Sequence, residues 1–135
     1  MKKLLVICII FIISITLVLL FYPKVLIKSA SDIQSLFVYS IDEDGMRVDI
    51  TQQIDIAELL KNMQITTGRL KIAYQPFHLG SDVKWEIEVI GNDYNFIVVL
   101  GSINFKYYPK NSRWVTYQIQ DPSNIILLLE SAAIH

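Results

Sequence analysis

The chain is poor in the residues that cross-link small exported domains or hold metal ions. It has one cysteine, Cys8, and two histidines, His78 and His135, among 135 residues. A lone cysteine excludes an intramolecular disulfide, and two isolated histidines without a CxxC or HExxH motif indicate no zinc site. We expect His78 to be a surface loop residue. The folded part must therefore depend on an ordinary hydrophobic core.

Motifs that carry chemistry are also missing. The sequence has no nucleophile elbow, no GxGxxG and no GxxxxGK[ST] phosphate loop. Asp42, Asp44 and Gly45 resemble part of a calcium loop, but Thr51 then stands where such a loop needs a bidentate Glu. A tight hairpin turn is the better interpretation. We therefore expect no catalytic residue, no bound cofactor and no metal ion.

Two glutamates form a candidate carboxylate pair. Glu86 and Glu88 stand two residues apart in an alternating segment, so they share one face of a strand. A paired carboxylate site is conceivable there. Their alternation with Trp85 and Ile87 predicts instead that both glutamates lie on a solvated face.

The dominant feature is one uncharged apolar run, residues 4–22. At 1.5 Å per helical residue it spans roughly 28 Å, close to the hydrocarbon thickness of a bilayer. Lys2 and Lys3 precede the run, and Pro23 and Lys24 follow it. The pattern predicts a single-pass membrane protein: residues 1–28 form the anchor and a linker, and residues 29–135 form one domain outside the cytoplasm.

A cleaved signal peptide is the alternative interpretation of the same run. The basic start fits it, but the apolar core is longer than the usual 7–15 residues. The small residues Ser29, Ala30 and Ser31 come several positions after the run ends. In that case the domain would be secreted, starting near Asp32.

The domain is acidic once the anchor is set aside. Four of the twelve basic residues lie at positions 2, 3, 24 and 28, which leaves eight against thirteen acidic residues in residues 29–135. This balance argues against nucleic acid as a partner, and against strong binding to anionic lipids or wall polymers.

Two periodicities alternate along the domain and predict its elements. A period of two, with turn residues between, predicts strands at 33–41, 46–50, 69–74, 83–89, 94–100, 103–107 and 113–120. Apolar residues at helical spacing begin at Ile56 and predict a helix there, with Asp55 as its N-cap and Glu58 three residues after the cap. A second helix should start at Pro122 after an Asp121 N-cap, and its residues 125–129 should be heavily buried. Residues 94–100 are apolar on both faces, which predicts a central strand.

These elements give the order β-β-α-β-β-β-β-β-α. Short connections favour an antiparallel meander, with both helices on the same face. The predicted fold is thus α+β: an N-terminal transmembrane helix followed by a two-layer domain. In this arrangement Leu59, Leu60 and Met63 should meet Ile126 or Leu129 and the inward strand residues Trp85, Ile87 and Phe96.

The stretches VDITQQIDIAELLKNM and RWVTYQIQDPSNIILLLE, with the meander between them, resemble small exported domains of unknown function common in Gram-positive bacteria. The resemblance covers about residues 33–130 and implies a capped helix after a hairpin, antiparallel strands and a C-terminal helix. Many of those proteins are lipoproteins, and this chain departs from them because no lipobox precedes Cys8. The resemblance implies no activity.

Four aromatic residues gather near the end of the sheet. They are Tyr107, Tyr108, Trp114 and Tyr117. Since neighbours alternate faces, some should point away from the core and could bind a partner.

We expect a non-enzymatic binding or interaction module with an envelope protein partner, an immunity-type protein being one version. The alternative is a small-ligand or glycan-binding module, or a hydrolase with an unrecognised site. A pocket enclosing aromatics would favour a ligand, and a flat apolar patch would favour a protein.

The membrane assignment predicts a simple fractionation result. Expressed in bacteria, the full chain should stay with the membranes after an alkaline wash, because a spanning apolar helix is not extracted by it. Protease added from outside should remove the domain. Recovery of a soluble product that starts near Asp32 would establish the signal-peptide alternative.

Overall fold

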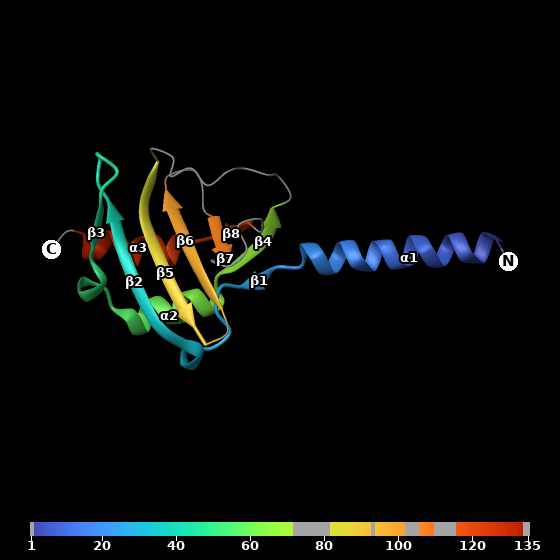
Figure 1. The fold of residues 1–135 in the computed structure, drawn as a ribbon, viewed down its shortest axis with the longest axis horizontal. Helices are drawn as coiled ribbons and strands as arrows, with labels where there is room; N and C mark the ends of the chain where they lie inside the picture. Colours follow the sequence, from blue (N-terminus) through green and yellow to red (C-terminus); the bar gives the residue numbers. More distant parts are fainter. Residues whose placement is uncertain (1, 72–81, 93, 102–105, 110–115, 134–135) are drawn as a thin grey trace.

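The computed structural model describes residues 2–71, 82–92, 94–101, 106–109 and 116–133, shown in Figure 1. The helices are α1 (Lys2–Phe21), α2 (Ile56–Ile65) and α3 (Ser123–Ala132), with 3₁₀ turns at Ala30–Asp32 and Thr51–Gln53. The strands are β1 (Lys24–Val25), β2 (Ile33–Ile41), β3 (Arg47–Asp49), β4 (Thr67–Lys71), β5 (Val83–Gly91), β6 (Asn95–Gly101), β7 (Lys106–Pro109) and β8 (Thr116–Gln120). The protein is α+β, as predicted, with an N-terminal apolar helix.

Helix α1 projects away from the rest of the protein (Figure 1). None of its residues is buried, although nearly all are apolar. By length and composition it is a candidate to cross a membrane. Its Thr16 hydroxyl donates to the Ile12 carbonyl oxygen at 2.8 Å, so this polar group is satisfied within the helix.

The described strands form one antiparallel sheet in the order β1-β4-β8-β7-β6-β5-β2-β3. Strands β5 to β8 are a meander, and β6 is central, as predicted. The meander does not extend to the other strands: β4 pairs with β8, and β2 pairs with β5. The reason is helix α2, which carries the chain from β3 at one edge to β4 near the other. Strand β1 was not expected; its two residues are too few to show a periodicity.

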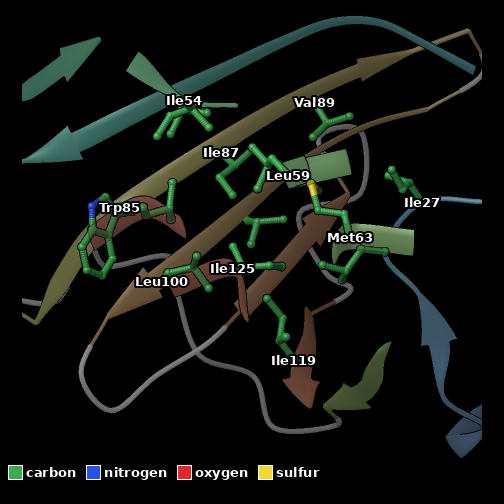
Figure 2. Packing of buried hydrophobic residues seen from close by; sticks show 14 of the residues in the cluster. Ile27, Ile54, Leu59, Met63, Trp85, Ile87, Val89, Leu100, Ile119 and Ile125 are labelled. Atoms are coloured by element: carbon green, nitrogen blue, oxygen red, sulfur yellow. The ribbon is translucent and has the colours of Figure 1, made fainter. Parts of the chain in front are cut away.

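Both helices pack on the same face of the sheet, which confirms the two-layer arrangement. Trp85, Ile87 and Val89 alternate along β5 towards the helices. Figure 2 shows Leu59 and Met63 of α2 in the same cluster as these strand residues and Ile125 of α3. The fully buried side chains of this core are Phe96, Ile27, Leu59, Met63, Ile87, Leu100, Ile125, Leu129, Val38, Val89 and Val98.

The helix caps agree with the sequence at α2 and differ at α3. The Asp55 carboxylate accepts a hydrogen bond from the Glu58 backbone N–H at 3.1 Å, so Asp55 is the expected N-cap. At α3 the N-cap is Pro122, and Ser123 is the first helical residue. Asp121 takes a left-handed conformation, with φ of 46°, and its carboxylate accepts from the Ser123 hydroxyl at 2.6 Å. This turn displaces the helix start by one residue.

Burial differs from expectation at two elements. Residues 125–129 of α3 were predicted to be heavily buried; Ile125 and Leu129 are fully buried, but Leu127 is 63% exposed because the sheet covers only one side of the helix. The β2–β3 hairpin forms as predicted, with Gly45 at φ of 78° in its turn. Its second strand is not half-buried, however. Met46 and Val48 are 65% and 49% exposed, because β3 is an edge strand with no helix over it.

Replacing Leu59 by Ala should lower the stability of the full chain by about 2–5 kcal/mol, because a fully buried side chain is lost between α2 and the sheet. Leu60, which is only partly buried, should give a smaller loss. Thermal unfolding in a mild detergent measures both. The control is Lys61→Ala, since the Lys61 side chain is 72% exposed. Equal melting temperatures for Leu59→Ala and Lys61→Ala would contradict this packing of α2.

Candidate functional site

A cavity lies where the chain leaves α1 and enters the domain. Its volume is about 750 Å³, within the range of small-molecule sites. Residues 23–28, Asp32 and Gly68 form part of its wall. Three tyrosines, Tyr94, Tyr107 and Tyr117, complete it.

The sheet register brings these tyrosines together. Tyr107 on β7 and Tyr117 on β8 are directly opposite each other, and their ring centroids are 5.2 Å apart. Tyr107 also contacts the buried ring of Phe96 at 4.5 Å, and Tyr94 stacks on the other side of Phe96 at 5.7 Å. The aromatic rings thus extend the hydrophobic core to the cavity wall.

The tyrosine hydroxyls supply polar groups within this apolar wall. The Tyr94 Oη atom is buried and has no hydrogen-bond partner in the part of the chain that the structure describes. Burial raises the pKa of Tyr94, and the nearby Asp32 carboxylate raises it further. Burial, with smaller effects of Tyr117 and Tyr94, raises the pKa of Tyr107 to about 12. Both phenols stay protonated at neutral pH and can donate a hydrogen bond.

The lining charges are two lysines and one aspartate. Lys24 and Lys28 belong to the segment that follows α1, and Asp32 ends the first 3₁₀ turn. The Lys24 ammonium lies 5.8 Å from the centroid of the Tyr117 ring, within reach of a cation–π interaction. The cavity is therefore locally basic, although the domain as a whole is acidic.

A second hollow adjoins the cavity along α1. Its volume is about 380 Å³, and it shares Lys24 and Tyr117 with the cavity. The remaining lining residues are Thr16, Leu19 and Leu20 of α1 and Leu70 of β4. The two hollows are therefore neighbours, with Lys24 and Tyr117 between them.

Two of the four aromatic residues singled out in the sequence lie at this site. Tyr107 and Tyr117 contact each other and line the cavity. Tyr108 pairs with Ile97 in the backbone register, and Trp114 lies outside the described residues, as do His78 and His135.

Sequence reasoning did not find Tyr94, nor the lysines that face the tyrosines. Tyr94 looked like the first residue of a strand, and Lys24 and Lys28 like linker residues. Their proximity arises from the pairing of Lys24 with Gly68 and of Val25 with Thr67. No residue pattern in the sequence marks such a short pairing.

The carboxylate pair on β5 is not on a solvated face, so that prediction was wrong. Glu86 is 3% exposed, and its carboxylate contacts the Arg47 guanidinium at 2.6 Å. Arg47 reaches from β3 across β2, where its guanidinium lies 4.0 Å from the centroid of the Tyr39 ring. Glu88 lies 4.0 Å from the same guanidinium. The hairpin side chains cover this part of the second face, and the ion pair joins edge strand β3 to β5.

The predicted hairpin turn replaces a calcium loop. The Asp42 carboxylate accepts from the Met46 backbone N–H at 2.7 Å, and the Asp42 carbonyl accepts from the Gly45 N–H at 3.0 Å. Asp42 therefore serves the turn itself. Among the described residues, no group of three or more His, Cys, Asp or Glu side chains could hold a metal ion.

Comparison with known proteins does not place the chain in a family. No family model matches it, and no curated protein and no solved structure is significantly similar to it. The function must therefore be inferred from the geometry of the chain itself.

Glu86 predicts a particular pH dependence. Burial raises the pKa of Glu86 above its usual 4.5, while Arg47 opposes this shift and Glu88 adds to it. As the pH rises from about 4.5, the unfolded chain ionises Glu86 more readily than the folded chain, so the folded state loses stability through the raised pKa. Glu86→Gln removes this loss. The melting temperature of Glu86→Gln relative to wild type should therefore rise between pH 4 and pH 7.

The matched control is Glu43→Gln, at the exposed tip of the hairpin. Its melting temperature relative to wild type should stay constant over the same pH range. If Glu86→Gln instead becomes less stable relative to wild type as the pH rises, the Arg47 ion pair outweighs the effect of burial.

Proposed function

We propose that this protein is a non-enzymatic binding module, anchored to a membrane by α1 with its domain outside the cytoplasm, and that the tyrosine-lined cavity holds its ligand. The cavity is the observation that carries this proposal. It joins three aromatic rings and two lysines in one hollow.

The properties of α1 support anchoring. The helix is uncharged from Leu4 to Phe21, it is long enough for a bilayer, and no part of it is buried against the domain. Charged side chains flank the helix at both ends, Lys2 and Lys3 before it and Lys24 after it. They would lie at the two polar surfaces of the membrane. Secretion after cleavage remains the alternative. It would free the domain near Asp32 and remove residues 23–28 from the cavity wall.

The shape of the site supports a ligand rather than a flat protein contact. Small-molecule sites are concave and largely apolar, with a few polar groups that orient the ligand. The cavity fits this description: the tyrosine rings and Val25 offer apolar surface, and the ammonium groups of Lys24 and Lys28 offer polar contacts.

The chemistry of the lining favours binding over catalysis. A general base has to be deprotonated near neutral pH, and the raised pKa values of Tyr94 and Tyr107 keep both phenols protonated. The charged groups on the wall are Lys24, Lys28 and Asp32, which can hold a charged ligand by ion pairing.

A second candidate function is supported by the edge strand β3. Met46 and Val48 are exposed there, next to backbone groups that an edge strand leaves unpaired. An envelope protein could add a strand at this edge, and an immunity-type protein would bind its target in this way. This surface lies on the opposite side of the domain from α1 (Figure 1).

Two tryptophan substitutions separate the candidates. Val25 is 40% exposed and lines the cavity, so Val25→Trp should fill it, whereas Val48→Trp alters only the edge of β3. We expect a fraction of bacterial envelope extract to raise the melting temperature of the detergent-purified full chain and of Val48→Trp, but not of Val25→Trp. Binding of a protein from the same extract that is lost only in Val48→Trp, with no Val25-sensitive shift, would instead establish the second candidate.

A further inference from the structure

We infer that the ligand of the cavity is an anionic membrane lipid, taken from the leaflet beside α1, with its headgroup between Lys24, Lys28 and the tyrosine hydroxyls. This inference rests on the proposed binding function and names the class of ligand. Four features of the described residues support it: position, continuity with α1, local charge and hydrogen-bonding capacity.

The position of the cavity matches the headgroup region. Only Tyr22 and Pro23 separate the end of α1 from β1, and residues 23–28 form one wall of the cavity. If α1 spans the hydrocarbon core, these residues lie in the interfacial layer, where lipid phosphates and glycerol groups also lie. A lipid headgroup would then reach the cavity without leaving the membrane surface.

The second hollow continues this position into the apolar layer. Leu19 and Leu20 belong to the last turns of α1, and Leu70 faces them from β4. The hollow shares Lys24 and Tyr117 with the cavity. An acyl chain can therefore lie against α1 while the headgroup of the same molecule occupies the cavity, which a soluble ligand would not require.

The local charge selects an anion despite the acidity of the whole domain. Lys24 and Lys28 outnumber Asp32 on the cavity wall. The acidic turn at Asp42, on the β2–β3 hairpin, lies on the far side of the domain from α1 (Figure 1). This acidic turn is thus distant from α1, whereas the two lysines lie directly after it. This distribution favours one bound anionic headgroup over broad adhesion to an anionic surface.

The hydroxyls and Asp32 match a headgroup that carries both a phosphate and hydroxyl groups. Tyr107 lines the cavity and is protonated, so its hydroxyl can donate to a phosphate oxygen. The carboxylate of Asp32 can accept a hydrogen bond from a headgroup hydroxyl. Phosphatidylglycerol has both features, whereas phosphatidylcholine has no net charge and no headgroup hydroxyl.

The test measures lipid binding to the detergent-purified full chain by native mass spectrometry. We expect phosphatidylglycerol to bind about tenfold more tightly than phosphatidylcholine, because two lysines contact the extra charge. Lys28→Gln should reduce this preference, and Lys61→Gln, on an exposed face of α2, should leave it unchanged. Soluble glycerol phosphate in excess should not displace the bound lipid.

Three results would overturn the inference while leaving the proposed binding function intact. Equal binding of the two lipids would show that the cavity does not distinguish a charged headgroup from a neutral one. Displacement by glycerol phosphate would assign the cavity to a soluble anion. Lipid binding that Val25→Trp does not reduce would place the lipid outside the cavity. Failure of the binding function itself is distinct: no compound of any class would then bind in a way that Val25→Trp abolishes.

Discussion

The architecture where α1 meets the domain depends on one short backbone pairing. Lys24 and Val25 pair with Gly68 and Thr67, and the Leu26 N–H continues the contact by donating to the Thr66 carbonyl oxygen at 3.0 Å. Leu26 and Ile27 are then buried in the core cluster, at 3% and 1% exposure. The hydrophobic burial of these two side chains holds the pairing in place. Without it, the segment after α1 would be a free linker, and Lys24 would not meet Tyr117.

Much of the fold could be read from local patterns. The alternation along residues 83–89, the turn at Gly45 and the cap at Asp55 each act within a few residues, and each formed where the sequence indicated. The partner of β4 could not be read in this way. Which strand it joins depends on the path of α2 across the sheet, and that path is set by tertiary packing of Leu59 and Met63.

The candidate site was predictable only in part, for two physical reasons. Tyr107 and Tyr117 were recognisable as aromatic neighbours, but the pairing of β7 with β8 decides that their rings touch. Glu86 shows the second reason. Alternation tells which face a side chain takes but not what covers that face, and here Arg47 arrives from a strand two positions away in the sheet. Long side chains from a neighbouring hairpin leave no periodic signal.

The two-residue junction between α1 and β1 restricts how the domain can move. Pro23 stiffens this junction, and the burial of Leu26 and Ile27 leaves no slack beyond it. In the proposed anchored arrangement, this short junction would keep the cavity close to the membrane surface. A lipid site held there would sample a two-dimensional solution, so its occupancy would follow the mole fraction of the lipid in the leaflet rather than a bulk concentration. A change in membrane composition would then change the fraction of molecules that carry a bound lipid.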